Sequence, residues 1–276
     1  MKKLSLYVFL VLMFCNFGFA QNYEVISKNP NKIKRGLLKK VYLTKLKNKD
    51  AYQIIKDPTG LSPIENIEMF SPKKGDCSTE KHWGGEVTDC NSGRQRLEIS
   101  QGTKDGVRKS SIRKNPKEYW YGYYLFIPNN FPTNDKYCTP YINQFFAFNK
   151  GTKGGLAPFF SGALIGGRFM FDGNIIIERD KLKNNWHKIE IHIRFSIKDD
   201  GFIKVYHNNK LKLERKNFVT MPKDYLFVKY GIYNYKGSSV PYHLYADYSF
   251  PDQTIYFAGY SISKKKENLK INRNKE

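Results

Sequence analysis

The sequence predicts an all-β protein, an antiparallel β-sandwich made of a single domain. Aromatic residues are abundant, with 20 Tyr and 20 Phe among 276 residues, and aromatic side chains favour the pleated, half-buried surface of a sheet. Short alternations of apolar and polar residues recur between turn signals, whereas the periodicity of long amphipathic helices is missing. Many strands with short turns, and no helices alternating between them, are typical of an antiparallel sandwich.

The first twenty residues have the pattern of a signal peptide. Lys2 and Lys3 precede the apolar run Leu4–Phe14, and Gly18-Phe19-Ala20 resembles a signal peptidase site. A membrane anchor is the alternative, but the run is short for a bilayer span, which needs about 20 apolar residues. We therefore expect residues 1–20 to be removed, no transmembrane segment to remain, and the protein to be secreted or periplasmic.

Three stretches follow the signal. Residues 21–50 are rich in Lys and Asn and have little periodicity, so we expect an irregular basic lead-in. Residues 51–262 hold the strand patterns and form the predicted domain. Residues 263–276 are strongly charged and are expected to be a disordered basic tail.

Strand patterns recur along the domain. In Trp186–Phe195, apolar and polar residues alternate with a period of two. The Asp200-Gly201 step is a hairpin signal, and it leads into a strand at Phe202–His207. Further strands are expected at 118–128, 142–148, 168–171, 175–178, 226–233 and 254–260.

The chain is strongly basic. Its formal net charge is +22, or +20 without Lys2 and Lys3, and its pI is about 9.7. Such a protein attracts polyanions such as nucleic acid, anionic lipid surfaces or acidic glycans. A genome that favours lysine everywhere is the alternative explanation. Export argues against nucleic acid, so we expect an acidic polysaccharide as the partner, while the tail could also associate with a membrane surface.

Three cysteines remain after Cys15 leaves with the signal peptide. In an oxidising compartment, Cys77 and Cys90 are the natural disulfide pair, closing a loop that contains His82. A metal site is the alternative, but no CxxC pair accompanies these cysteines, and we expect no metal site. Cys138 is then an odd thiol, which we expect to be buried.

The first of three polar strands is Arg94–Ser100. Arg94, Arg96 and Glu98 share one face of this strand, while Leu97 and Ile99 face the other way. Two guanidiniums and a carboxylate are costly to bury, so this face should line a solvated cleft. There, Glu98 could orient an arginine that grips an anion bidentately. A surface ladder of salt bridges is the alternative.

Two further strands carry isolated polar residues. Gln144 is the exception in an aromatic-rich segment, and its alternative role is that of a core amide satisfied by backbone. Lys229, Gly231 and Tyr233 share a face of a later strand, and the glycine could let a ligand approach the sheet. An ordinary amphipathic strand with a packed tyrosine is the alternative.

In this order along the chain, the three strands resemble the jelly-roll polysaccharide lyases. The resemblance is closest to the group of heparin lyase I and glucuronan lyase and more distant to alginate lyases. It covers about residues 51–260 and implies a concanavalin-like β-jelly roll. Further similar segments are Asp57-Pro58-Thr59-Gly60, Gly75-Asp76-Cys77, Asp89-Cys90, Glu118–Gly122 and Trp186-His187.

The resemblance implies cleavage of a uronic-acid polymer by β-elimination. Arg96 and Gln144 match the positions that neutralise the uronate carboxylate, with Arg94 and Glu98 beside them. Tyr233 matches the tyrosine that serves as acid and, in some members, also as base. A free tyrosine has a pKa near ~10, so acting as a base would require nearby cations such as Lys229 and the arginines. Asn234 and Lys229 are expected to contact the substrate.

Phe146 departs from the family pattern. Many relatives carry a catalytic histidine at this position, and Phe146 can only contact the substrate. His82 could supply the imidazole, Tyr233 could work without one, or the protein could bind glycans without cleaving them. His187 and His192 are weaker candidates. The resemblance implies no required cofactor; calcium is possible by analogy, although no Asp-rich loop with suitable spacing is present.

Three functions follow from these residues. The first is an exported lyase for a uronate polysaccharide, and the second is a non-catalytic carbohydrate-binding sandwich. The third is a glycoside hydrolase on a similar fold. A hydrolase needs a pair of carboxylates beside the scissile bond, and the three strands offer clearly only Glu98.

Overall fold

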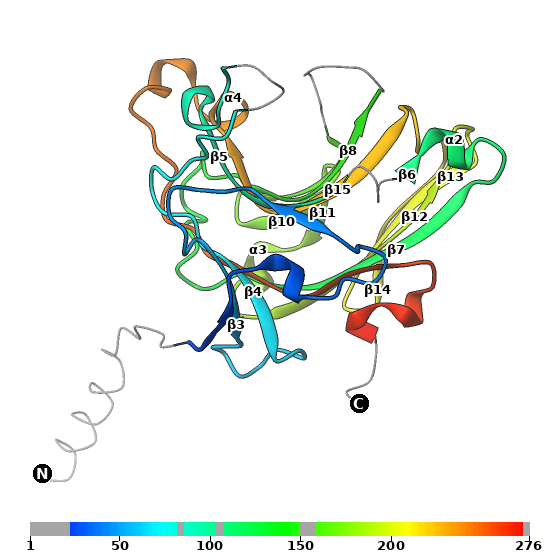
Figure 1. The fold of residues 1–276 in the computed structure, drawn as a ribbon, viewed down its shortest axis with the longest axis horizontal. Coiled ribbons are helices and arrows are strands. Elements are labelled where there is room, and N and C mark those ends of the chain that lie inside the picture. Colours follow the sequence, from blue (N-terminus) through cyan, green and yellow to red (C-terminus); the bar gives the residue numbers. More distant parts are fainter. Residues whose placement is uncertain (1–22, 82–85, 103–106, 150–157, 273–276) are drawn as a thin grey trace, which may run out of the picture.

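The computed structural model describes residues 23–81, 86–102, 107–149 and 158–272 (Figure 1). The expected signal peptide and His82 therefore lie outside the described residues. Within the described ranges, no helix has the length and apolar character needed to cross a membrane.

Two large antiparallel sheets form the domain, which confirms the predicted sandwich. The first sheet has the strand order β1-β3-β4-β16-β7-β12-β13-β14. Its strands are β1 (Val25–Ser27), β3 (Tyr52–Lys56), β4 (Asn66–Phe70), β16 (Ile255–Ser263), β7 (Lys117–Phe126), β12 (Trp186–Phe195), β13 (Gly201–His207) and β14 (Lys210–Phe218).

The second sheet has the order β11-β10-β9-β8-β15-β5-β2, and β6 also pairs with β15. Three of its central strands, β8, β15 and β5, are the three polar strands of the sequence (Figure 1). Its strands are β11 (Asn174–Ile177), β10 (Arg168–Phe171), β9 (Pro158–Ile165), β8 (Tyr141–Phe148), β15 (Tyr225–Tyr235), β5 (Arg94–Gln101), β2 (Val41–Leu43) and β6 (Val107–Arg108).

The core lies between the two sheets. On β12, Ile189, Ile191 and Ile193 are fully buried, as the period of two predicts. On β15, Val228 and Ile232 face the same core from the second sheet. The few helices are single turns, namely α2 (Lys109–Ile112), α3 (Arg179–Leu182), α4 (Lys236–Ser239), η1 (Pro30–Lys32), η2 (Cys90–Ser92), η4 (Tyr242–Leu244), η5 (Lys266–Asn268) and η6 (Lys270–Asn272).

The lead-in is tied to the core by a buried arginine. Arg35 is 1 % exposed and forms an ion pair with Glu68 of β4. Its guanidinium also donates to the hydroxyl of Tyr230 at 2.5 Å and to the Pro30 carbonyl at 2.6 Å. The lead-in, residues 23–50, is therefore mostly irregular in shape but fixed in place.

The expectation of a disordered tail at 263–276 is wrong for residues 263–272. Ser263 ends β16, and Leu269 and Ile271 are buried after it. Both pack against Gly122 of β7, where an added Cβ would lie 2.7 Å from each side chain. Two apolar residues in a charged segment were enough to fix it, because a glycine in the sheet leaves room for them.

The disulfide between Cys77 and Cys90 is confirmed. Cys138 is a free, buried thiol, as expected, and burial raises its pKa to about 12. The disulfide stands directly before β5, so it fixes the chain where the first polar strand begins.

Candidate functional site

The site is on the open face of the second sheet, defined here as the face directed away from the core. Residues directly opposite one another on paired strands project from the same face. One such row runs across five strands, from β2 to β9. It consists of Tyr42, Ser100, Lys229, Gln144 and Ser161.

A second row holds the expected acid. Tyr233 of β15 pairs with Arg96 of β5 and with Tyr141 of β8. Between the two rows, Glu98 pairs with Gly231. The structure therefore brings together Arg96, Glu98, Lys229 and Tyr233 with Gln144, as their positions on strand faces predicted.

Arg96 is held by an aspartate that sequence reasoning did not assign. Its Nη2 lies 3.1 Å from Oδ1 of Asp89, which is fully buried. Glu98, the expected partner, is more distant, with 3.9 Å between its Oε2 and Arg96 Nε. The turn η2 and Gly93, with φ +65°, fold Asp89 back beside β5. Only its place next to Cys90 could have pointed to it.

Glu98 is a buried carboxylate between two cations. Its Oε2, the oxygen nearest Arg96 Nε, also lies 3.8 Å from Lys229 Nζ. Burial raises the pKa of Glu98, and Lys229 and Arg96 oppose that effect. Burial also lowers the pKa of Lys229, which Glu98 partly offsets. Glu98 thus serves to position two basic groups.

Tyr233 is surrounded by arginines. Arg94 Nε donates to its hydroxyl at 3.2 Å, and the guanidinium carbon of Arg96 lies 5.0 Å from the ring centre. Burial raises the pKa of Tyr233, and the two arginines only partly counter it. Tyr233 is therefore a neutral phenol at neutral pH, with a proton to donate.

Gln144 has no partner for its amide. It is 1 % exposed, and neither its Oε1 nor its Nε2 has a hydrogen-bond partner among the described residues. The alternative of a core amide satisfied by backbone is therefore not what the structure has. Buried amides are nearly always paired, so an unpaired one beside Lys229 is suited to a ligand that supplies the partner.

Phe146 gives the open face an aromatic wall. Its ring stacks on Phe227 with 5.6 Å between centres. The ammonium of Lys229 lies 4.5 Å from the centre of the Phe146 ring. A phenyl ring at this position holds a cation over its face, where an imidazole would carry a proton.

Two residues of β15 differ from expectation. Asn234 was expected to contact the substrate, but it is 1 % exposed on the opposite face, donating to Gln95 and Gln253. It follows Tyr233 directly, and successive strand residues point to opposite faces. Gly231 has φ +136°, and an added Cβ would lie 2.3 Å from the Leu97 carbonyl oxygen. The glycine makes room for β5 and not for a ligand.

Three described histidines, His187, His192 and His207, lie on strands β12 and β13 of the first sheet and not on the sheet that carries the site. His187 is buried in the first sheet, where its Nδ1 is 3.0 Å from Nε2 of His207. His192, also on β12, stacks on Trp120 with 4.0 Å between ring centres. Among the described residues, no group of three or more His, Cys, Asp or Glu could hold a metal ion, so the structure identifies no calcium ligands.

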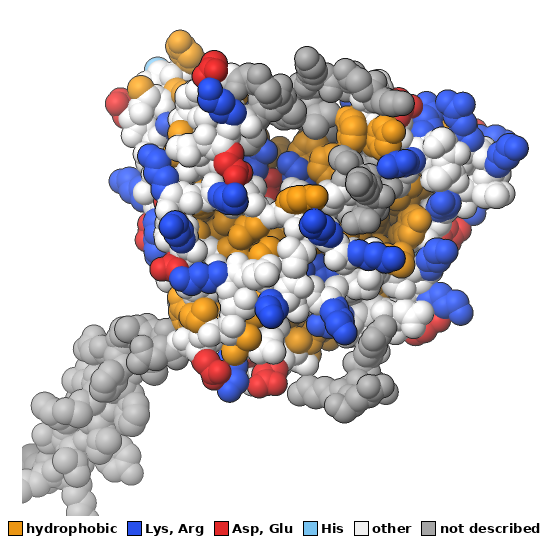
Figure 2. Space-filling view, viewed as in Figure 1, with side chains coloured by type: hydrophobic (Ala, Val, Ile, Leu, Met, Phe, Trp, Pro, Cys, Tyr) orange, Lys and Arg blue, Asp and Glu red, His pale blue; other side chains and the backbone are white. Residues whose placement is uncertain are grey.

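The surface agrees with this geometry. Figure 2 shows a hollow in the region where Figure 1 has β5, β15 and β8, with hydrophobic side chains inside it. Basic side chains are gathered over the middle of the visible face below it. The arrangement can bind an anion, neutralise it and donate a proton beside it.

Comparison with known proteins gives a family and a fold. A family model described as polysaccharide lyase matches residues 26–249. The structure of endo-β-1,4-glucuronan lyase from the fungus Trichoderma reesei is similar, with a TM-score of 0.52 and 11 % identity. That similarity covers 83 % of this chain and 90 % of the fungal one.

A variant of the alginate lyase Aly36B, solved with an alginate tetrasaccharide, has a TM-score of 0.50 and 14 % identity. The match covers 88 % of this chain and 93 % of that one. Among curated proteins, no match was found.

Proposed function

The chain belongs to the polysaccharide lyase family, and from this we propose that it cleaves a uronic-acid-containing, anionic polysaccharide by β-elimination. The observation that carries the proposal is the unpartnered amide of Gln144 beside the cations of the open face. The fold is shared with a glucuronan lyase and an alginate lyase, whose names indicate acidic polymers. The Cys77–Cys90 disulfide supports action outside the cytoplasm.

The first requirement of β-elimination is to stabilise negative charge on the uronate. Loss of the C5 proton places a second negative charge next to the carboxylate, so preorganised donors there supply the largest catalytic effect. Gln144 can donate its free N–H groups to that carboxylate. Arg96, fixed by Asp89, presents its guanidinium from the neighbouring row.

The second requirement is an acid for the leaving oxygen. As the bond from C4 to the glycosidic oxygen breaks and the C4–C5 double bond forms, that oxygen must gain a proton. Tyr233 fits this role because burial raises its pKa and keeps it protonated. Arg94 donates to the Tyr233 oxygen and stabilises the phenolate that remains.

The third requirement is a base for the C5 proton. A protonated Tyr233 cannot accept it, so the proposal assigns this step to another group. Lys229 is an amine of this site, burial lowers its pKa, and it stands next to Gln144 in the same row. His82 is the other group to test, and it lies outside the described residues.

The test is a panel of glucuronan, alginate and heparin-type glycans, with the ultraviolet absorbance of the unsaturated uronate as the readout. We expect turnover on at least one uronate polymer. Tyr233→Phe should lower turnover about 10²–10⁴-fold, and His82→Ala and Lys229→Gln should identify the base. If no polymer of the panel yields the unsaturated product while several bind, the proposal is wrong and the protein is a binding module.

A further inference from the structure

The disulfide between Cys77 and Cys90 lies at the surface, next to a residue that is fully buried. Cys90 is exposed and Cys77 is half-buried, so a dissolved reductant can reach the bridge. Asp89, which directly precedes Cys90, is 0 % exposed and forms an ion pair with Arg96. The covalent link therefore stands beside the buried anion that orients a cation of the open face.

The turn that contains Cys90 contacts both arginines of β5. We call residues 89–93 the disulfide turn; Gly93, with φ +65°, ends it directly before Arg94. The Asp89 carbonyl accepts from the amide of Arg94 at 3.0 Å. The Asp89 carboxylate lies 3.1 Å from the guanidinium of Arg96. One residue of the turn thus fixes the backbone of the first arginine and the side chain of the second.

The same turn contacts the strand that carries the expected acid. The Gly93 carbonyl accepts from the amide of Lys236, directly after β15, at 2.9 Å. On β15, Tyr233 accepts a hydrogen bond from Arg94 and packs against the guanidinium of Arg96. The hydroxyl of Tyr233 is therefore placed by two arginines that the disulfide turn itself places.

Two links hold the turn to the segment that follows β4. The disulfide joins Cys90 to Cys77, and the amide of Cys90 donates to the Ser78 carbonyl at 3.2 Å. A backbone hydrogen bond contributes little net stability in water, so the covalent bridge is the stronger link. Neither cysteine belongs to the buried core cluster between the sheets. Breaking the bridge should therefore release the turn and leave the core packed.

We propose that the Cys77–Cys90 disulfide and Asp89 form one positioning unit for the elimination, an inference that rests on the proposed function for the reaction it serves. The bridge holds the turn, and Asp89 transmits the position of the turn to Arg96. None of the three residues of the unit is assigned a contact with the substrate. Full activity therefore requires the oxidised bridge.

Reduction of the bridge is the direct perturbation. A dithiol such as dithiothreitol gives up two electrons and two protons and forms its own cyclic disulfide, while the Cys77–Cys90 bond breaks and each sulfur becomes a thiol. We expect kcat for a uronate polymer to fall about 10²-fold, because a displacement of about 1 Å in catalytic geometry has this effect. Circular dichroism at the assay temperature should show that the reduced protein remains folded.

The matched control removes the bridge by mutation. The double variant Cys77→Ser, Cys90→Ser should show the same loss of kcat without any reductant. The reductant should then have no further effect on this variant, which excludes an action of the reductant elsewhere on the protein.

A double-mutant cycle tests whether the bridge acts through Asp89. Asp89→Ala alone should lower kcat about 10²-fold. Adding the two cysteine changes to Asp89→Ala should lower kcat by less than about threefold further, because residues that act through one another are not additive. Asp89→Asn keeps an oxygen for Arg96 and should recover part of the loss. Losses that multiply as they do for independent sites would contradict transmission through Asp89.

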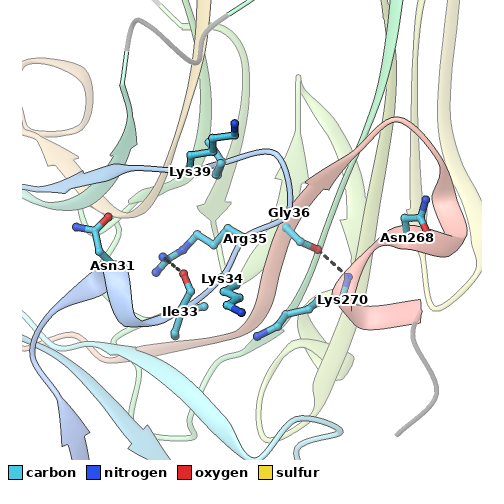
Figure 3. Close-up of a pocket in the computed structure, with 10 residues that line it drawn as sticks. Asn31, Ile33, Lys34, Arg35, Gly36, Lys39, Asn268 and Lys270 are labelled. Carbon is cyan, nitrogen blue, oxygen red and sulfur yellow. Dashed lines mark hydrogen bonds between the residues drawn. The ribbon is translucent and has the colours of Figure 1, made fainter. Parts of the chain in front are cut away.

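Arginine Nε–H signals in NMR report the same geometry without turnover. The Arg94 Nε–H, which donates to Tyr233, should exchange slowly with solvent in the oxidised protein and at least about tenfold faster after reduction. Arg35 is the internal reference. Its Nε donates to the Tyr230 hydroxyl, and Figure 3 shows its guanidinium turned toward Ile33, whose carbonyl accepts from it at 2.9 Å. The Arg35 signal should keep its exchange rate, because none of these partners belongs to the disulfide turn.

Two results would overturn the inference: unchanged kcat with unchanged exchange at Arg94 after reduction, or equally faster exchange at Arg94 and Arg35, which indicates general loosening. A failure of the proposed function gives a different result. If the oxidised protein cleaves no uronate polymer but reduction accelerates exchange at Arg94 alone, the proposed function is wrong and the turn still positions the arginines. Cleavage that is indifferent to the bridge gives the reverse.

Discussion

Gln144 combines a cost in stability with a use in catalysis. Leaving a buried polar group unsatisfied costs about 1–3 kcal/mol, and both polar atoms of the Gln144 side chain lack partners among the described residues. We therefore expect Gln144→Leu to raise the free energy of unfolding by about 1 kcal/mol or more. The same variant should lower kcat by about 10²–10³-fold, as for loss of one donor to a developing anion.

Urea unfolding and steady-state kinetics check the Gln144 prediction. The control is Asn143→Leu, one residue earlier on β8. Asn143 donates to the Lys229 carbonyl and to Tyr260, so this variant should lose stability. If Gln144→Leu is destabilised to the same degree, its amide has a structural partner and the assigned role is wrong.

Tyr233 should affect the reaction but not the binding. Tyr233→Phe keeps the ring beneath Arg96 and removes only the hydroxyl. We expect kcat to fall about 10²–10⁴-fold, the usual contribution of a general acid, with polymer affinity changed by less than about twofold. Tyr141→Phe is the control, because Tyr141 lies 6.1 Å from Tyr233 between ring centres. Retained turnover in Tyr233→Phe would contradict the assignment.

The pH profile follows from the same residues. Burial raises the pKa of Tyr233, so activity should decline only above the ordinary tyrosine value of about 10. Burial lowers the pKa of Lys229, so activity that depends on its neutral form should rise as pH approaches that lowered value from below. If His82 is the base, the acid limb lies near about 6.5 and disappears in His82→Ala. Measuring kcat/KM against pH for both proteins distinguishes these cases.

At the scale of elements, Arg35 fastens the lead-in to both sheets. It contacts Glu68 of the first sheet and Tyr230 of the second. Removing one partner of a buried ion pair costs about 3–5 kcal/mol, so Arg35→Met should lower the free energy of unfolding by that amount. The double variant with Glu68→Gln should recover part of the loss. Lys40→Met, on the exposed lead-in, is the control and should cost less than about 0.5 kcal/mol; an equal loss in both would refute the argument.

The C-terminal segment protects a buried carboxylate. Glu190 of β12 is fully buried, and its oxygens contact Asn272 Nδ2 at 2.8 Å and Lys266 Nζ at 3.1 Å. Deleting residues 264–276 should therefore destabilise the domain through the lost apolar packing and through the loss of two partners of Glu190, which leaves only Lys188 Nζ, at 3.7 Å, beside the buried carboxylate. Glu190→Gln in the shortened chain should restore part of the stability in urea unfolding. No restoration would mean that only the packing matters.

At the scale of the whole molecule, period-two patterns predicted much of the architecture and the orientation of the main polar residues. The face from which a residue projects follows from its position within its own strand, so the sequence correctly places Arg96, Lys229 and Tyr233 on one face of the second sheet. Contacts between segments that are distant in the sequence were missed, because a local pattern of apolar and polar residues carries no information about them. Asp89 reaches Arg96 only through a turn, and the C-terminal segment packs on the first sheet where Gly122 leaves space for Leu269 and Ile271. The sequence patterns did not predict the short N-terminal strands β1, β2, β3 and β4, nor β6, β9 and β14.

The domain should lose stability in mild acid through the His187–His207 pair, which joins β12 to β13. His187 Nδ1 lies 3.0 Å from His207 Nε2, and His187 Nε2 is 2.9 Å from the Leu182 carbonyl. Burial, with the nearby charges of His187, Lys212 and Lys181, lowers the pKa of His207 to about 4, and burial also lowers that of His187. In the unfolded chain both titrate near about 6.5.

The unfolded state therefore binds more protons than the folded state between about pH 6.5 and 4, so the free energy of unfolding falls as pH falls through this window. Below the folded-state pKa of His207, about 4, the imidazole is protonated in both states and the loss of stability from this group is complete. Glu98 has the opposite effect on the free energy of unfolding, because burial raises its pKa and the folded state therefore holds its proton more tightly. Every variant compared keeps Glu98, so its effect does not change the comparison. Urea unfolding across this window should show a smaller pH slope for His207→Gln than for the unmodified protein. The exposed His243→Gln should keep the original slope, and an unchanged slope in His207→Gln would show that the pair does not control acid stability.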